Sequence, residues 1–304
     1  MKIYTITLNP AYDVHASAVT FSAGCENLAN IISREAGGKG VNISRALQTN
    51  HIPNTAVVVL GTENAEQFRQ ELKAAEIDAC YLRCPGRIRE NLTLHTQGQP
   101  ETRISFAGFP LDDGILEDVL QVLHVDGQTV VTFTGRVASG MSVEKVKDFL
   151  KELKCRGAKL VLDSKSLTAA DILEISPWLI KPNQEEISAY IGHPVHTLQE
   201  AAEAAKAFAD VENVIVSMGD QGAILLTAGG GYGAKPPKIQ AVSTIGAGDS
   251  MIAGFLAAAS QGQTPAKCLK RAVAYGTAAC LTPGTLPPKP ADVEVIYSQT
   301  EEIL

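Results

Sequence analysis

The chain has 304 residues, of which 45% are hydrophobic and 19% charged, a composition typical of a globular protein with a large core. Its net charge of −7, with few aromatic residues and no run of Lys or Arg, argues against nucleic acid as a main partner. No apolar run approaches the ~20 residues of a membrane helix, the N-terminus does not resemble a signal peptide, and the cysteines include no CxxC pair. We therefore expect a cytoplasmic protein with no membrane partner.

Short β-rich apolar runs alternate with longer segments of helical spacing. Several of these runs are apolar at successive positions, as in strands covered on both faces. The predicted strands are residues 2–8, 56–60, 129–134, 159–163, 178–181 and 213–217. Strands and helices in alternation predict an α/β protein with a mainly parallel sheet.

Helix boundaries are marked by capping residues. Residues 142–156 carry apolar side chains on one face, and Gly157 is a suitable stop. Thr197 and Glu200 form a capping-box pattern, and Thr264 precedes a proline at a predicted helix start.

Two stretches interrupt the alternation. The first covers approximately residues 10–36, and the second, within residues 88–108, reads as a hairpin turning at Gly98, Gln99 and Pro100. Strands inserted there cannot easily join the main sheet in sequence, so we predict a small second sheet over the strand ends, where such folds place their sites. Residues 1–304 are thus predicted to form a single domain with a lid made of these two insertions.

The segment with the clearest chemistry is Gly246-Ala247-Gly248-Asp249. A strand pattern at residues 239–242 leads into it, and an apolar helix follows. Glycines and the unpaired amides of a helix N-terminus form a seat for phosphate oxygens or for a phosphoryl group in transfer. Asp249, in the first turn, is placed to accept a proton from an attacking hydroxyl. The alternative is a tight turn in which Asp249 only caps the helix.

Other phosphate-binding motifs are absent from the sequence. There is no GxxxxGK[ST] and no HRD/DFG pair, and a dinucleotide fingerprint would need glycine where Met251 stands. A P-loop enzyme, a protein kinase and a nicotinamide dehydrogenase are therefore disfavoured.

Together with residues 37–42 and 181–186, this segment resembles the ribokinase-like sugar kinase family of the phosphofructokinase-B type, over essentially the whole chain. Residues 5–13, 87–92 and 234–237 resemble its phosphosugar branch, above all the members that act on fructose 1-phosphate. The resemblance implies a ribokinase-like three-layer α/β fold with a small β-sheet lid, ATP and Mg²⁺ as cofactors, and a homodimer formed through the lid.

On the nucleotide side, the resemblance assigns each motif a role. Asp249 matches the catalytic base, and Gly246, Ala247 and Gly248 match the anion hole. Asn183 and Glu186 match residues that organise magnesium and the ATP phosphates through water, which suits a site with so few carboxylates. The nucleotide loop corresponds to Ser217, Gly219 and Gly222.

On the sugar side, Asp13, expected at the end of the first strand, matches a residue that accepts hydrogen bonds from sugar hydroxyls. Arg89 matches the arginine that binds the phosphate already on the substrate, a role that suits a forked guanidinium. Lys39 either meets a phosphate or covers the loop as a solvated charge. The residues of the sugar-contacting motif are Gly37, Gly38 and Asn42.

Several positions depart from the family pattern. Arg136 stands where a serine near the substrate phosphate is usual, so it either strengthens phosphate binding or points to solvent. Lys165 replaces a small residue or arginine, and Ser243 replaces the aspartate of simple-sugar members. His193 and His196 have HxxH spacing but are expected in a surface loop without a metal.

The resemblance implies transfer of the ATP γ-phosphoryl group to a ketohexose phosphate. Fructose 1-phosphate, giving fructose 1,6-bisphosphate, is the first expectation, and tagatose 6-phosphate or fructose 6-phosphate is the alternative. A non-catalytic sugar-phosphate sensor is a third reading, which the intact Asp249, Asn183 and Glu186 oppose.

Overall fold

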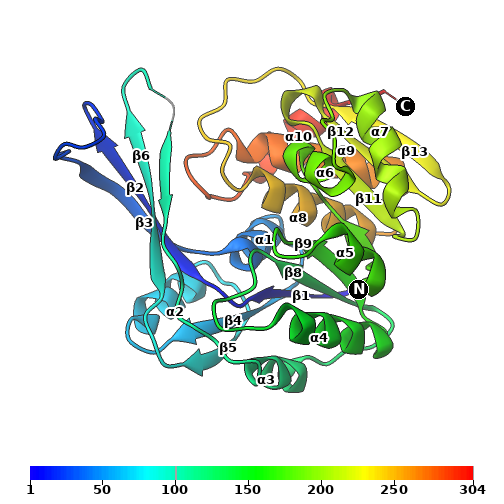
Figure 1. Ribbon diagram of the computed structural model, residues 1–304. Helices are drawn as coiled ribbons and strands as arrows, with labels where there is room; N and C mark the ends of the chain where they lie inside the picture. The colour runs from blue at the N-terminus through cyan, green and yellow to red at the C-terminus, as the bar shows by residue number, and fades with distance from the viewer. Residues whose placement is uncertain (100, 304) are drawn as a thin grey trace.

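The computed structural model of the chain describes residues 1–99 and 101–303 and has a ten-stranded sheet at its centre (Figure 1). The strands of this sheet in chain order are β1 (Lys2–Thr7), β4 (Thr55–Gly61), β5 (Ala79–Cys84), β8 (Thr129–Thr134), β9 (Lys159–Asp163), β10 (Leu179–Ile180), β11 (Asn213–Ser217), β12 (Ala223–Thr227), β13 (Gly230–Lys235) and β14 (Glu301–Glu302). In space their order is β14-β13-β12-β11-β10-β9-β8-β1-β4-β5. The strands from β5 to β11 are parallel, and β11 to β14 pair antiparallel. The prediction of a mainly parallel sheet is confirmed.

Helices cover both faces of this sheet. They are α1 (Lys39–Thr49), α2 (Ala65–Ala74), α3 (Ile115–Val122), α4 (Val143–Cys155), α5 (Ala169–Ile175), α6 (Gln184–Ile191), α7 (Leu198–Ala205), α8 (Ala247–Ser260), α9 (Pro265–Ala279) and α10 (Pro290–Gln299), with short 3₁₀ turns η1 (Lys206–Phe208) and η2 (Gly219–Gln221). Val130 and Val131, neighbours in β8, belong to different apolar clusters because successive strand side chains point to opposite faces. One cluster joins α1, α8, α9 and α10, and the other joins α2 to α7, which gives three layers.

The predicted helix boundaries agree with the structure. α4 begins after Ser142, and Gly157 follows it with a φ of 98° that favours glycine. Thr197 accepts a hydrogen bond from the Glu200 amide in a complete capping box. Thr264 is the N-cap of α9, with proline in the first turn. None of the described helices is long and apolar enough to cross a membrane.

The strand predicted at residues 239–242 is wrong. β13 ends at Lys235, and Pro236 and Pro237 follow it without the amide hydrogens that a strand ladder needs. The Val242 amide instead donates to the Cys280 carbonyl, at the end of α9. The segment is therefore a loop that lies against α9 before entering α8.

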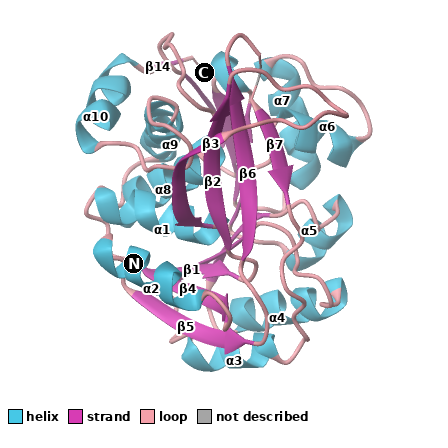
Figure 2. Cartoon of the chain, turned by 90° about the vertical axis from the view of Figure 1, so that its left-hand side faces the viewer, coloured by secondary structure: helices cyan, strands magenta, loops and turns pink. Residues whose placement is uncertain are grey.

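A separate four-stranded sheet projects from the main body (Figures 1 and 2). Its strands are β2 (Ala11–Ala18), β3 (Asn30–Gly37), β6 (Arg89–Thr96) and β7 (Thr102–Ser105), in the order β3-β2-β6-β7. The predicted small second sheet is thus confirmed. Of the predicted hairpin turn, Gly98 has the positive φ of 72° that favours glycine, and Pro100 lies outside the described residues. Asp13 lies within β2 of this sheet, not at the end of β1, because the chain leaves β1 at Thr7 and turns into the small sheet at Ala11.

Candidate active site

The carboxylate of Asp249 lies at the start of α8, close to the carboxyl ends of the parallel strands. Gly246 is the N-cap, and its φ of 80° lies in the left-handed region that glycine enters without strain. Only 5% of Asp249 is exposed, and its Oδ2 accepts a hydrogen bond of 2.9 Å from Nδ2 of Asn42 on α1. The structure therefore brings Asn42 and Asp249, 207 residues apart in sequence, into direct contact.

Two lysines and a second aspartate surround this carboxylate. Lys39 Nζ lies 3.0 Å from Asp163 Oδ2, and Lys181 Nζ lies 3.7 Å from the same oxygen. Although burial alone would raise the pKa of Asp163, Lys181 and Lys39 hold it below its ordinary value. Burial opposes the charge of Lys39, but Asp163 and Asp249 raise its pKa above the usual range. Both partners therefore stay ionised, and Lys39 points into the site against Asp163.

Burial raises the pKa of Asp249 to about 6, against the opposing field of Lys39. Asp163 raises it further, whereas the hydrogen bond from Asn42 and the charge of Lys181 lower it. A carboxylate that titrates near neutral pH is well matched to accepting a proton from a hydroxyl and releasing it again.

The residues predicted to form an anion seat lie at the first turn of α8. Gly246, Ala247 and Gly248 open the helix, where the first amides have no intrahelical partner. A methyl group on Gly248 would lie 3.2 Å from Nζ of Lys181, so a buried ammonium stands beside these amides. Positive charge from the helix end and from Lys181 converges on one point in front of Asp249.

Asn183 and Glu186 form a reciprocal capping box at the start of α6. Asn183 Oδ1 accepts from the Glu186 amide at 2.8 Å, and Glu186 Oε2 accepts from the Asn183 amide at 3.0 Å. The other oxygen, Oε1, faces Lys165 Nζ at 3.6 Å. A carboxylate and an amide oxygen are oxygen ligands that suit a magnesium ion held through its own water shell.

The predicted nucleotide loop lies beside this capping box, because Asn183 and Ser217 form a parallel β-bridge. Gly219 starts η2, and the Met218 amide donates to the Gly222 carbonyl at 2.8 Å. A side chain on Gly222 would overlap the Ala234 carbonyl of β13, and its φ of 108° favours glycine. Packing against β13 therefore accounts for Gly222.

Asp13, the residue predicted to bind sugar hydroxyls, lies on β2 of the small sheet. Its Oδ1 accepts from Asn91 Nδ2 at 3.0 Å, and its Oδ2 lies 3.4 Å from Oγ1 of Thr285 in the loop after α9. A side chain on Gly37 would overlap the Asp13 carboxylate, and Gly38, with a φ of 117°, is the N-cap of α1. The two glycines therefore let the chain pass close to Asp13 on its way into α1.

Arg89 and Arg103 lie near Asp13, and the charge of Arg136, an exposed residue, reaches Arg89. Burial lowers the pKa of Arg89, Asp13 opposes this shift, and the charges of Arg103 and Arg136 lower the pKa further. Arg89 Nη1 donates to the Phe106 carbonyl, and its buried Nε has no partner among the described residues. Arg103 Nη2 lies 3.5 Å from Asp13 Oδ1. Three guanidinium groups whose charges act on one another outnumber the Asp13 carboxylate, an arrangement that suits a phosphate.

Sequence reasoning did not single out Lys181, Asp163 or Arg103 as site residues. Asp163 is the last residue of the buried strand β9, and Lys181 directly follows the buried strand β10. Polar side chains at these positions reach the edge of the sheet where such folds place their sites. Arg103 pairs in register with Thr93 of β6, and only this pairing reveals its neighbours.

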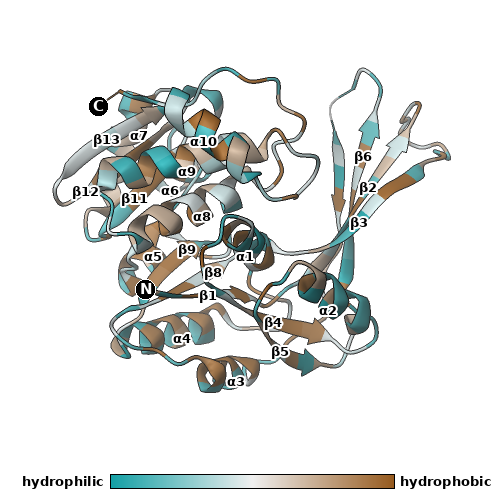
Figure 3. Cartoon of the chain, turned by 180° about the vertical axis from the view of Figure 1, so that it is seen from behind, coloured by the Kyte–Doolittle hydropathy of each residue, from teal (hydrophilic) through white to brown (hydrophobic). Residues whose placement is uncertain are grey.

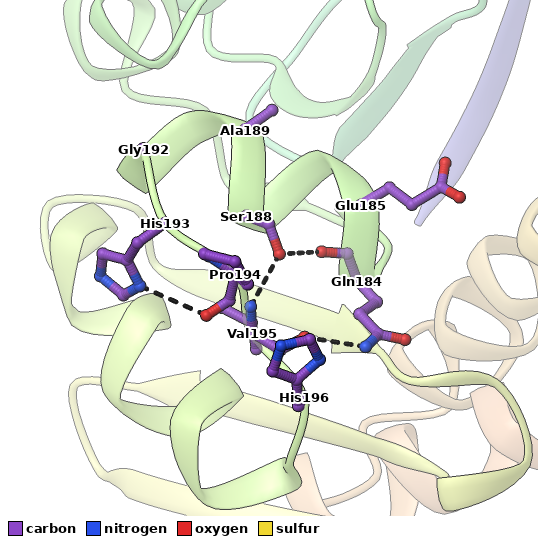
Figure 4. A pocket seen from close by; sticks show the side chains of 9 residues that line it. All are labelled: Gln184, Glu185, Ser188, Ala189, Gly192, His193, Pro194, Val195 and His196. Atoms are coloured by element: carbon purple, nitrogen blue, oxygen red, sulfur yellow. Dashed lines mark hydrogen bonds between the residues drawn. The ribbon is translucent and has the colours of Figure 1, made fainter.

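A surface cavity of about 630 Å³ lies away from these residues, between α6 and α7 (Figure 4). His193 and His196 line it, and each is exposed. Its polar side chains are satisfied locally: Gln184 Nε2 donates to the Val195 carbonyl, and Ser188 Oγ accepts from the Val195 amide. No group of three His, Cys, Asp or Glu side chains placed to hold a metal ion occurs among the described residues, and both imidazoles lie in the loop between α6 and α7.

A sequence profile described as "pfkB family carbohydrate kinase" matches residues 5–292. The 1-phosphofructokinase of Vibrio cholerae serotype O1 is 34% identical over 259 residues, which cover 84% of this chain and 81% of that protein. The 1-phosphofructokinase of Bacillus subtilis strain 168 is 30% identical over 279 residues, 91% of each chain. The crystal structure of Escherichia coli phosphofructokinase-2 with substrates and products superposes with a TM-score of 0.92 at 25% identity, covering 98% of this chain and 99% of that one.

Proposed function

Because the chain belongs to the pfkB family of carbohydrate kinases, we propose that it transfers the γ-phosphoryl group of ATP to fructose 1-phosphate, giving fructose 1,6-bisphosphate. The observation that carries this proposal is the buried Asp249 carboxylate at the N-terminus of α8, with a separate arginine cluster of Arg89, Arg103 and Arg136 whose charges act on one another. A base, an anion seat and a separate phosphate seat are the three parts that such a reaction needs.

On the sugar side, Asp13 would accept hydrogen bonds from neighbouring hydroxyls, and the arginine cluster would bind the phosphate already on the sugar. With one end of the sugar held by these contacts, its free primary hydroxyl would extend toward Asp249. The proposed sugar site is completed by Gly37, next to Asp13, by Gly38 at the start of α1, and by Asn42, which contacts Asp249.

Asp249 would accept the proton of the attacking hydroxyl as the new P–O bond forms and the bond to ADP breaks. The amides of Gly246 to Gly248 and the ammonium of Lys181 would stabilise the charge on the transferring group. Magnesium, when bound with ATP through water to Asn183 and Glu186, would neutralise phosphate charge. The loop of Ser217, Gly219 and Gly222 would hold the nucleotide.

A 6-phosphate of fructose or tagatose is the second candidate substrate. The similarity to phosphofructokinase-2 favours it, and the same residues could bind either end of a ketohexose. The proposed sensor role finds less support, because a sensor has no need of a buried carboxylate with a pKa of about 6.

The small sheet is the proposed dimer surface. It exposes several large apolar side chains, and its outer strands β3 and β7 present unpaired edges. The exposed apolar residues are Ile31, Ile32, Ile104 and Phe106. A homodimer would cover them across a two-fold axis. The cytoplasmic location and the identity of the metal as magnesium likewise stay predictions.

The test is a coupled ADP-release assay with Mg-ATP and four acceptors: fructose 1-phosphate, fructose 6-phosphate, tagatose 6-phosphate and unphosphorylated fructose. We expect the highest kcat/KM with fructose 1-phosphate and the lowest with fructose, which cannot use the arginine cluster. A preference for either 6-phosphate would replace the first candidate with the second. Binding without turnover on all four would refute the kinase proposal.

A further inference from the structure

A chain of three titratable side chains runs through the small sheet and ends beside the proposed sugar site. Glu101 Oε1 lies 3.2 Å from Nδ1 of His95, and His95 Nε2 lies 3.0 Å from Nδ1 of His15. The two rings stack with centroids 5.3 Å apart. Glu101 and His95 are partly exposed, whereas His15 is only 5% exposed and stands two residues after Asp13 in β2.

The inner end of this chain touches the loop after α9. A methyl group on Gly284 would overlap Nε2 of His15, so the imidazole packs directly on the glycine backbone. The next residue, Thr285, has its hydroxyl 3.4 Å from Asp13 Oδ2 and its Cα 3.6 Å from where a side chain on Gly246 would begin. Residues 284 and 285 therefore separate the small sheet from the anion seat and contact both.

We propose that His15, held by His95 and Glu101, is a positioning residue that docks the small sheet on the loop of Gly284 and Thr285, and that an added proton on this relay undocks it. The proposal rests on the proposed function only in treating Asp13 as a sugar-binding residue. Docking keeps Asp13 next to Thr285 and so sets the distance between the sugar and the anion seat.

The direction of the hydrogen bonds follows from Glu101. An ionised carboxylate accepts, so His95 Nδ1 carries a hydrogen, and neutral His95 then accepts at Nε2 from Nδ1–H of His15. This leaves His15 Nε2 without a hydrogen, packed against Gly284, and this atom has no partner among the described residues. A bare ring nitrogen is tolerated there because no N–H is buried without an acceptor.

One more proton changes this arrangement whichever ring receives it. If His95 gains the proton, both its nitrogens donate, so His15 must accept at Nδ1 and carry its hydrogen at Nε2. If His15 gains it, Nε2 is again protonated. In both cases an N–H group faces the Gly284 backbone without an acceptor, at a cost that separation of the two surfaces would relieve.

The charged groups around the relay support this direction. Burial and the charge of His95 lower the pKa of His15, against opposing effects of Glu35 on β3, Asp13 on β2 and Glu101. The loop of residues 281–288 contributes no titratable side chain. Because docking disfavours the protonated form of His15, docking is complete above the ordinary histidine pKa of about 6.5 and weakens as the pH falls below it.

The first test uses proton NMR of the full chain and requires no turnover. Spectra of His15→Asn and His95→Gln assign the two relay rings among the six histidines. We expect the pKa of His15 to lie below the ordinary histidine value of about 6.5 and to shift in His95→Gln. A His15 that titrates at about 6.5, unaffected by His95→Gln, would refute the relay whatever the enzyme's substrate is.

The second test compares the KM for fructose 1-phosphate at pH 7.5 and pH 5.5. His15→Asn keeps a donor toward His95, but the asparagine cannot take up a proton. When the pH falls from 7.5 to 5.5, the KM of the wild type should therefore rise by a larger factor than the KM of the variant. The difference can reach about tenfold, the limit for one linked proton. Titration of the sugar phosphate itself cancels in this ratio. An equal rise in both proteins would refute the pH dependence.

The third test probes docking by size. Gly284→Ala, at a φ of 60°, should raise the KM for the sugar phosphate at least tenfold, because its methyl group would overlap Nε2 of His15. Gly262→Ala is the matched control, because its φ is 69° and a methyl group there would meet nothing within 4 Å. Equal KM values for Gly284→Ala and Gly262→Ala would overturn the docking role.

Discussion

Asp249→Asn should inactivate the enzyme and stabilise the fold at the same time. Asparagine has the shape of aspartate and keeps an oxygen to accept from Asn42 Nδ2, but it cannot accept a proton. Loss of the base should lower kcat by about 10²–10⁴-fold, or roughly 3–5 kcal/mol of transition-state stabilisation.

The gain in stability follows from the pKa. Burial raises the pKa of Asp249 from 3.8 to about 6, so the folded protein holds this proton more tightly than the unfolded chain does. The stability linked to the protonated form is present below pH 3.8 and is lost as the pH rises through about 6. A shift of this size corresponds to at most about 3 kcal/mol at pH 8, so the variant should gain roughly 1–3 kcal/mol there.

Urea unfolding of wild type and Asp249→Asn at pH 8 and pH 4, with the ADP-release assay at pH 8, measures both effects. The gain in unfolding free energy should shrink as the pH falls from about 6 to 4, and wild-type kcat should fall below about pH 6. A variant less stable than wild type at pH 8 would show that the buried charge is not costly. A kcat within tenfold of wild type would remove Asp249 as the base.

Other substitutions test the anion seat, the phosphate seat and the dimer. Gly248 has an ordinary helical backbone, and Gly248→Ala would place a methyl group 3.2 Å from the buried ammonium of Lys181. This change should lower kcat by ~10–100-fold, and a normal kcat would show that Lys181 is not part of the anion seat. Arg89→Ala and Arg136→Ser should each raise the KM for the sugar phosphate by ~10-fold or more while leaving the KM for ATP unchanged. The control is Arg156→Ala, because Arg156 forms only an exposed ion pair with Glu152, and neither KM should change. An unchanged sugar KM in Arg136→Ser would place the Arg136 side chain outside the phosphate seat. Phe106→Asp should turn a dimer into a monomer in light scattering, and a monomeric wild type at micromolar concentration would contradict the dimer.

Local signals predicted much of the fold. The strands at residues 129–134, 159–163 and 213–217 match the structure at both ends, because each is a short apolar run bounded by polar or turn residues. The short edge strand β14 was not predicted, since two glutamates have no apolar pattern and pair only because β13 offers an open edge. Residues 239–242 have an apolar pattern but form no strand. The two prolines shortly before them lack the amide hydrogens that a strand ladder needs.

The site divides in the same way. Gly246, Ala247 and Gly248 were predicted to form an anion seat and Asp249 to be the base, and the structure places all four at the start of α8, because a helix N-terminus is a local feature. Arg103 and Asp163 were not recognised as parts of the site. Their partners Asp13 and Lys39 lie 90 and 124 residues away, and no local pattern connects them.

By itself, the sequence determined the order of strands and helices, the helix caps and the residue types of the anion seat, because these depend on interactions within a few residues. Only the tertiary structure decided which charges face one another. It paired Lys39 and Lys181 with Asp163 and packed His15 against Gly284. It also brought Arg103 and Arg136 close enough to Arg89 for their charges to lower its pKa. Burial then made these contacts consequential, because the low dielectric of the interior strengthens each charge interaction and raises the pKa of Asp249 to about 6.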